Sequence, residues 1–361
     1  IYIMIYISNI AINKIIENYK LSNIKGMIVA SPSSSPPYQY HWVRDASIIM
    51  NVIIKHYLKT KGNNLFLMII NYIENSAQIQ KLNTLTGLGE PKVNIDRTPF
   101  NDSWGRPQND GPALRGINMI KIYKLLMDNR YIHISNIVLS IINKDCDYIL
   151  NNYNKICFDL WEEINGWHFY TRMVQLKFLI DCLNLDEDIL KINHKSINLV
   201  INKLIENLKD HIDKTNQCII SSFDKNGNIT KYDDASILLA FCHINFDRTI
   251  LDHFKLELVI KNCENLINYF RKKYNRNDIN LIGRYINDSY YNGHLWIICS
   301  LALAQVYKRL NKEIISAQIL KFVISIDEDF NLSEQYDLVE NKQLSAKKLT
   351  WNYAELYNFI N

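Results

Sequence analysis

Two glutamate-containing stretches, well separated in the chain, have residue types suited to acid–base chemistry. One is the run DLWEEING at 159–166, where Glu162 and Glu163 follow a tryptophan and precede a turn. The other is LSEQYD at 332–337, which carries Glu334. A carboxyl group in an apolar surrounding can donate a proton near neutral pH, and a carboxylate can accept one. We therefore expect the two stretches to meet across one pocket, with an acid on one wall and a base on the other.

The adjacent glutamates Glu162 and Glu163 cannot do the same job, because neighbouring side chains on a helix or turn point in different directions. A simpler interpretation of the pair is an acidic helix N-terminus, where the helix dipole favours negative charge. The residues alone leave this choice open.

The elements that must position these carboxylates are predicted to be helices. Apolar residues recur at helical spacing through most of the chain, and sustained strand-type alternation is scarce, so the fold class is all-α. Long loops alternate with short turns, and if successive helices run antiparallel, all the long loops lie on one end of the bundle. Loops of this length inside a compact domain usually carry function. The twelve predicted helices lie near 5–20, 46–58, 64–83, 113–127, 131–152, 168–183, 195–210, 234–245, 251–272, 293–310, 312–326 and 343–360.

The tryptophans lie in or near the long loops. One tryptophan alone is as compatible with a core position as with a site. Six near one rim favour an aromatic pocket that stacks on sugar rings, with polar groups between for the hydroxyls. They are Trp42, Trp104, Trp161, Trp167, Trp296 and Trp351.

Composition excludes several other classes of function. The net charge is +4, from 41 basic and 37 acidic residues without long runs. This pattern does not indicate a basic surface of the kind that binds nucleic acid. No apolar run reaches the length of a membrane helix, so no membrane partner is expected. The seven cysteines are scattered singly and the histidines form no HxxH or HExxH pattern, so no metal is expected. Since GK[ST] and GxGxxG motifs are also missing, we expect no cofactor.

Two stretches in the first long loops add polar and aromatic groups. The first stretch is PYQYHWVRD at 37–45, which contains Arg44 and Asp45. These two residues are equally compatible with a helix cap beside a salt bridge and with binding of a sugar ring through its hydroxyl groups. In SWGRPQNDGPALR at 103–115, Trp104 and Gln108 offer an aromatic face and hydrogen-bonding groups.

Together these blocks resemble the glucoamylases, family 15 of the glycoside hydrolases. Five blocks match in order, at 38–45, 104–115, 159–166, 283–296 and 333–351. Each block is modest on its own, but five in register are specific. The resemblance implies an (α/α)6 barrel of six inner and six outer helices, which agrees with the twelve helices predicted above, and a single catalytic domain over 1–361.

The resemblance also implies an inverting mechanism. Glu162 matches the general acid, Glu334 the general base that activates a water, and Glu163 a substrate-binding carboxylate. Carboxyl groups used in this way stand roughly 6.5–9.5 Å apart to leave room for the water.

Further residues would bind the substrate. Arg44, Asp45 and Arg284 match groups that hold the terminal glucose and its neighbour. Trp104 would support the acid, and Trp296 would form a platform further out. The other residues implied are Tyr38, beside the cationic centre, and Trp42, Gln108, Trp161, Asp288 and Tyr290.

The implied function is an exo-acting glucan 1,4-α-glucosidase. Its substrate would be an α-glucan, either a polysaccharide (starch or glycogen) or a maltooligosaccharide. It would release β-D-glucose from non-reducing ends and cut α-1,6 bonds more slowly. Two alternatives stay open: a related inverting glycosidase acting on trehalose or an α-1,6-glucan, and a carbohydrate-binding relic without hydrolysis. The presence of both carboxylates with their flanking residues disfavours the relic.

A few positions depart from the family pattern and put chain-length preference in question. They are Asn109, His294 with Leu295, and Trp167 with His168. Because the disulfide pattern of secreted fungal members is not reproduced and no starch-binding module follows Asn361, we expect an intracellular form or one acting on soluble glucan. No targeting segment is visible, so an intracellular, vacuolar or secreted location stays open, and a monomer is expected.

Overall fold

The computed structural model describes residues 2–361, which form two compact units. Unit 1 comprises the chain up to Asn18 together with Ser31–Gln39 and Asp210–Asn361. Unit 2 comprises Tyr19–Ala30 and Tyr40–Lys209. Each unit is thus assembled from segments that are discontinuous in the sequence. Within residues 2–361, no helix combines the length and apolar content needed to cross a membrane.

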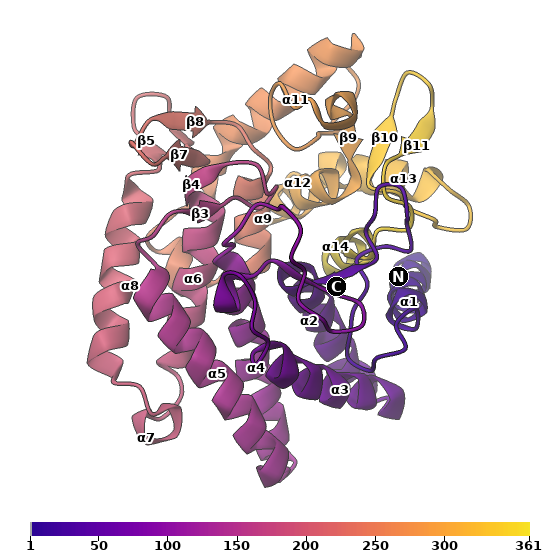
Figure 1. The fold of residues 1–361 in the computed structure, drawn as a ribbon. Coiled ribbons are helices and arrows are strands. Elements are labelled where there is room, and N and C mark those ends of the chain that lie inside the picture. The colour runs from indigo at the N-terminus through magenta and orange to yellow at the C-terminus, as the bar shows by residue number, and fades with distance from the viewer. Residues whose placement is uncertain (1) are drawn as a thin grey trace. The chain divides into compact units, whose positions relative to one another are not determined.

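Unit 2 contains a set of packed helices and four short strands (Figure 1). Helix α4 packs against α2, α5 and α6, while α3 packs against α2 and α5, and α8 covers α6. A short 3-10 turn lies at Gly87–Gly89. The helices are α2 (Val43–Thr60), α3 (Asn63–Ile79), α4 (Asp110–Asp128), α5 (Ile132–Asn152), α6 (Phe169–Cys182), α7 (Glu187–Leu190) and α8 (His194–Lys209), and the strands are β1 (Tyr40–Trp42), β2 (Lys92–Asn94), β3 (Cys157–Phe158) and β4 (Asn165–His168).

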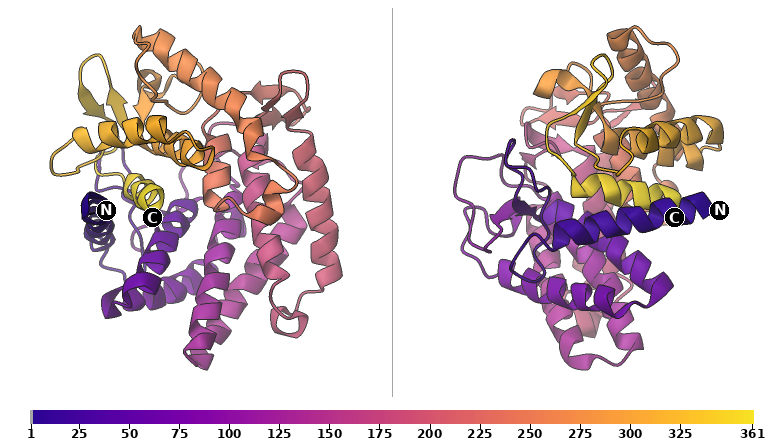
Figure 2. Two further views of the ribbon diagram at one scale, coloured as in Figure 1. Left: turned by 180° about the vertical axis from the view of Figure 1, so that it is seen from behind. Right: turned by 90° about the vertical axis from the view of Figure 1, so that its right-hand side faces the viewer.

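Unit 1 is built around α12, which packs against α9, α13 and α14. Helix α1 (Tyr2–Tyr19) runs alongside α14 (Figure 2), and the Asn18 amide donates to the Thr350 hydroxyl at 2.8 Å. Two 3-10 turns lie at Leu256–Val259 and Tyr290–Gly293. The other helices are α9 (Ser236–His243), α10 (Arg248–Leu251), α11 (Ile260–Tyr274), α12 (Ile297–Arg309), α13 (Glu313–Ser325) and α14 (Thr350–Ile360), and the strands are β5 (Ile212–Asp213), β6 (Cys218–Ile219), β7 (Ser222–Asp224), β8 (Ile229–Lys231), β9 (Leu295–Trp296), β10 (Gln335–Asp337) and β11 (Lys342–Leu344).

The helices fall into two classes by burial. In α4, fifteen of nineteen residues are buried, whereas in α5 seven of twenty-one are buried, on one stripe. A helix buried nearly all round lies inside, and a helix with one apolar stripe covers it. By this criterion α2, α4 and α6 are the inner helices of unit 2, and α9, α12 and α14 those of unit 1.

The twelve predicted helices all have a counterpart among residues 2–361, but three begin later than expected. The helix expected from 251 begins at Ile260, after the short α10 and a 3-10 turn, and two others begin later because of strand pairing. The helix expected from 293 begins at Ile297, and the helix expected from 343 begins at Thr350. In both cases the residues ahead form a short strand, because β10 pairs with β9 on one side and with β11 on the other. Helical periodicity does not report such pairings, so these short strands were not predicted.

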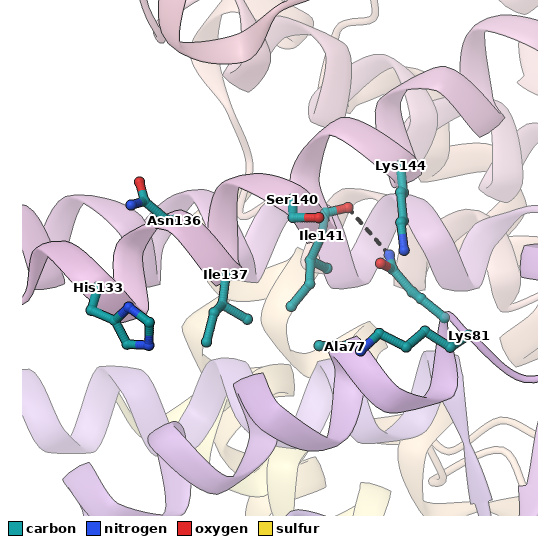
Figure 3. A pocket seen from close by; sticks show the side chains of 9 residues that line it. Ala77, Lys81, His133, Asn136, Ile137, Ser140, Ile141 and Lys144 are labelled. Carbon is teal, nitrogen blue, oxygen red and sulfur yellow. Dashed lines mark hydrogen bonds between the residues drawn. The ribbon is translucent and has the colours of Figure 1, made fainter.

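A hollow of about 400 Å³ lies on the outside of unit 2, between α3 and α5 (Figure 3). The exposed Lys81 and the residues His133 and Lys144 are among those that line it. It lies on outer helices, away from the residues that the sequence predicted for the site.

Candidate active site

Glu162 stands on a tight turn that Asp159 closes. The Asp159 carboxylate accepts from the backbone N–H groups of Glu163 and Ile164, at 2.7 and 2.9 Å. The backbone of Glu162 has φ of 69°, in the left-handed region that residues other than glycine seldom adopt. Such local strain clusters at functional sites, where the surrounding structure maintains it.

Four donors surround the Glu162 carboxylate. Oε1 accepts from Trp42 Nε1 at 2.7 Å, from Gln108 Nε2 at 3.0 Å and from Arg44 Nη2 at 3.4 Å. Oε2 accepts from Trp104 Nε1 alone among the residues described, at 2.7 Å. The two oxygens are therefore unequal: Oε1 is fully occupied, and Oε2 keeps room for a proton.

These partners come from three loops of unit 2 that each lead into an inner helix. Trp42 precedes α2, Trp104 and Gln108 precede α4, and Glu162 precedes α6. The prediction that the long loops gather on one rim is confirmed within this unit. Gly105 allows the close approach, because a Cβ there would lie 2.5 Å from the Glu162 carbonyl oxygen.

Arg44 is the centre of a buried ion network. Its guanidinium contacts Asp110 at 3.2 Å and Asp45 at 3.5 Å, and it donates to the Gln108 side-chain oxygen at 2.7 Å. Burial opposes the charge of Arg44, but the carboxylates of Asp110, Asp45 and Glu162 raise its pKa, so it stays protonated. Burial raises the pKa of Asp45 to about 6, against the effect of Arg44. Both predicted residues thus belong to the network that holds Glu162.

Lys92 is a site residue that the sequence did not single out. Strand β2 pairs antiparallel with β1 and sets Lys92 opposite Trp42. The ammonium lies over the rings of Tyr40, Trp42, Phe100 and Trp104, at 4.3, 4.4, 4.2 and 3.2 Å from their centroids. Only the pairing of β2 with β1 reveals the aromatic surroundings of this lysine.

In unit 1, Glu334 is buried and held at both carboxylate oxygens. Oε1 accepts from the Tyr38 hydroxyl at 2.9 Å, and Oε2 accepts from the Ser345 hydroxyl. The backbone N–H of Glu334 donates to Ala346 at 2.8 Å. Burial and the nearby Glu334 carboxylate raise the pKa of Tyr38 well above its usual value, so the phenol stays a donor.

Tyr38, Tyr290 and Ser345 link their hydroxyl groups beside Glu334. The Tyr290 oxygen lies 3.4 Å from that of Tyr38 and 3.3 Å from that of Ser345. Tyr38 and Tyr290 were predicted as site residues. Ser345 was not, although it stands in a matched block. The sequence predicted a helix over 343–360, whereas Ser345 lies in the loop ahead of α14.

Arg284 and Asp288 form a buried bidentate pair in the same unit, with N–O distances of 2.8 and 2.7 Å. The guanidinium carbon lies about 5 Å from the ring centroids of Tyr290 and Trp296, at 5.1 and 5.0 Å. The loop before α12 and the loop before α14 therefore bring together Arg284, Asp288, Tyr290, Trp296 and Glu334, as predicted for this part of the chain.

Two tryptophans and Glu163 lie differently from the rest. Trp161 is buried, and the Glu163 side chain is exposed on the turn after the acid. Trp351 is buried near the start of α14, where its indole donates to Glu355 at 2.8 Å beside His243. The expectation that all six tryptophans serve one rim therefore stays a prediction for Trp351, whose described contacts are with Glu355 and His243.

A sequence profile described as "Glycosyl hydrolases family 15" matches residues 4–361. The chain belongs to this family. The prediction of a glycoside hydrolase of the glucoamylase type is thereby confirmed at the level of the family.

Curated relatives within family 15 are fungal and yeast proteins. The chain is 28% identical over 403 aligned residues to the "Probable glucoamylase" of Schizosaccharomyces pombe, covering 93% of this chain and 84% of that protein. It is 38% identical over 169 residues to "Glucoamylase-1" of Arthroderma benhamiae, covering 44% of this chain. That second match spans only 27% of the length of the relative.

The fold agrees with solved structures of the family. The glucoamylase from Saccharomycopsis fibuligera superposes with a TM-score of 0.87 at 20% identity, covering 99% of this chain and 94% of that chain. Family 15 glucoamylases are (α/α)6 barrels, so the predicted fold class is confirmed.

Proposed function

We propose that this protein is an inverting, exo-acting glucan 1,4-α-glucosidase, with Glu162 as general acid and Glu334 as general base. It removes β-D-glucose from the non-reducing ends of starch, glycogen or maltooligosaccharides, and it cuts α-1,6 bonds more slowly. Because one family profile matches residues 4–361, we assign both units to one catalytic domain.

The donor set around Glu162 is the observation that carries the proposal. Three donors fix Oε1, and Oε2 accepts only the Trp104 indole among the described residues. A general acid needs one oxygen held in place and another able to carry a proton toward the leaving group. Oε2 is therefore the oxygen that protonates the glycosidic bond.

Glu334 suits the role of base. The Tyr38 and Ser345 hydroxyl groups donate to its two oxygens, and donated hydrogen bonds favour the charged form of a carboxylate. An ionised carboxylate fixed in this way accepts a proton from water as the water attacks the anomeric carbon. The proton goes to Glu334, the glycosidic bond breaks, and the leaving hydroxyl takes its proton from Glu162.

Arg44, Asp45, Arg284 and Glu163 supply the charged groups for sugar hydroxyls in this proposal. Carboxylates accept from hydroxyl groups and guanidinium groups donate to them. Arg44 and Asp45 are pre-ordered by their own ion network, which reduces the ordering needed when a sugar binds.

The decisive experiment replaces each catalytic carboxyl by an amide. Glu162→Gln and Glu334→Gln, assayed on maltoheptaose, are each expected to lower kcat by several orders of magnitude, since positioned acid and base groups contribute about 10²–10⁴-fold each. Glu163→Gln is the matched control on the same turn, expected to raise KM more than it lowers kcat. Near-normal kcat in either catalytic variant would refute the assignment.

The stereochemistry of the product tests the inverting mechanism, and the choice of substrate tests the proposed linkage specificity. Proton NMR of the first glucose released is expected to show the β-anomer, and initial α-glucose contradicts inversion. Glucose release is compared on maltoheptaose, isomaltose and trehalose. If the protein does not act on maltoheptaose but rapidly hydrolyses trehalose or isomaltose, the proposed substrate is wrong. Trehalose or an α-1,6-glucan would then be the substrate.

A further inference from the structure

Lys92 is a buried cation in an unusual setting. The residue is 1% exposed. Within the described part of the chain, its ammonium has no hydrogen bond and no ion pair, and four aromatic rings surround it at 3.2 to 4.4 Å. A buried charge without a carboxylate partner is costly, and the faces of indole and phenol rings offset this cost through their negative quadrupoles.

The same rings bind the predicted acid. Trp42 and Trp104 present their faces to the Lys92 ammonium and their Nε1–H groups to the Glu162 carboxylate, at 2.7 Å in both cases. A cation over an indole face draws electron density from the ring and makes its N–H a stronger donor. The closest ring is that of Trp104, which holds Oε2, the oxygen assigned above to proton donation.

We propose that Lys92 is a positioning residue for the reaction: its cation orders the two indoles and strengthens the hydrogen bonds by which they hold the acid Glu162. The inference rests on the proposed role of Glu162. The geometry supports a cation rather than a neutral side chain, because four ring faces converge on one ammonium and edge-to-face contacts among Trp42, Trp104 and Phe100 complete the enclosure.

The charge state of Lys92 changes in an accessible pH range. Burial lowers its pKa to about 8, with Arg106 acting in the same direction, while the carboxylates of Glu162, Asp102 and Glu90 oppose the shift. Glu162 also faces Arg44, whose charge is fixed by Asp45 and Asp110. Of the cations in this cluster, Lys92 is therefore the one whose charge is lost on mild alkaline titration.

The first test uses the unaltered protein and needs no turnover. Tryptophan emission is followed from pH 6 to 10, and a transition near pH 8 is expected as the ammonium over Trp104 and Trp42 loses its charge. The transition is expected to vanish in Lys92→Met, whose unbranched side chain fills the same space without charge. A wild-type titration without this transition overturns the proposal, even if the variant does not fold.

The second test measures kinetics on maltoheptaose. Lys92→Met is expected to lower kcat at least 10-fold with KM changed less than 3-fold. The wild-type kcat is expected to fall as the pH rises through about 8, where Lys92 loses its charge, and the Lys92→Met profile is expected to lack this step. Lys81→Met, in the outer hollow of Figure 3, is the matched control and keeps wild-type values. A Lys92→Met enzyme with kcat within twofold of wild type and with the wild-type pH profile refutes the inference.

The outcomes separate this inference from the proposed function. If Glu162→Gln keeps its activity, Glu162 is not the general acid and the proposed function fails. The emission transition would then still show that Lys92 is charged among the aromatic rings. If Glu162→Gln is inactive and Lys92→Met is unaffected, the acid stands and the positioning role of Lys92 falls.

Discussion

The indole nitrogen of Trp104 lies 2.7 Å from Oε2 of Glu162, while 37% of the Trp104 surface stays exposed. A hydrogen bond to a charged group contributes about 1.5–3 kcal/mol. Trp104→Phe keeps an aromatic face over Lys92 and removes only the donor. We expect kcat on maltoheptaose to fall roughly 10- to 100-fold with a small change in KM, since every 1.4 kcal/mol is tenfold.

Trp42→Phe is the comparison for that variant. It removes a bond of equal length from Oε1, where Gln108 and Arg44 remain as donors. Its loss in kcat is expected to be smaller than that of Trp104→Phe. Equal losses would contradict the assignment of Oε2 as the oxygen that carries the proton.

Ser345 is predicted to matter for the base. Its hydroxyl donates to Oε2 of Glu334 and lies 3.3 Å from the Tyr290 hydroxyl oxygen. Ser345→Ala leaves Tyr38 as the donor to the other oxygen, so kcat is expected to fall about tenfold, within the range for one hydrogen bond to a charged group. Steady-state kinetics of Ser345→Ala, Tyr38→Phe and the double variant should show coupling, because both residues hold one carboxylate. Strict additivity would argue against a shared role.

The close approach at Gly105 gives a third prediction. A Cβ at this position would lie 2.5 Å from the Glu162 carbonyl oxygen and 2.7 Å from Phe158 Cδ1. Gly105→Ala must therefore displace the catalytic turn or the Trp104 loop. We expect a loss of about 1–3 kcal/mol in the free energy of unfolding, typical of overpacking, together with at least a tenfold loss in kcat.

Gly62→Ala is the matched control for that substitution. An added Cβ at Gly62 meets no atom closer than 3.6 Å, and its φ of −67° suits any residue. Urea unfolding and activity should both stay near wild type. A Gly105→Ala protein with the same properties as Gly62→Ala would show that the turn tolerates displacement.

The sequence predicted the helices and most of the site because both leave local patterns. Inner helices such as α4 retain helical spacing of apolar residues, and Glu162 stands in a block whose neighbours have fixed types. Lys92 and Ser345 leave no such pattern, because their surroundings come from strand pairing and loop contacts between distant residues. Trp351 is also instructive: its place beside a loop was visible in the sequence, but its hydrogen bond to Glu355, one helical turn on, was not.

His41 gives a prediction for stability in acid. His41 lies in strand β1 with its ring buried, and its Nδ1 accepts from the Ile28 N–H at 2.9 Å. Burial, with Arg115 and Arg97 nearby, lowers the pKa of His41 from 6.5 to about 3. The native protein thus leaves the ring neutral at a pH where the unfolded chain binds a proton. This contribution to stability is complete above pH 6.5 and is lost progressively as pH falls from 6.5 toward 3.

Urea unfolding at pH 7 and pH 5 measures the effect. Between these values the His41 contribution should fall by about 2 kcal/mol, because the unfolded ring gains its proton over about 1.5 units at 1.36 kcal/mol each. His41→Gln retains an acceptor for Ile28 but cannot titrate. It is therefore expected to be less stable at pH 7 yet to lose about 2 kcal/mol less on acidification. His253→Gln, at an exposed histidine, should keep the wild-type difference. An unchanged difference in His41→Gln would mean that the acid sensitivity arises elsewhere.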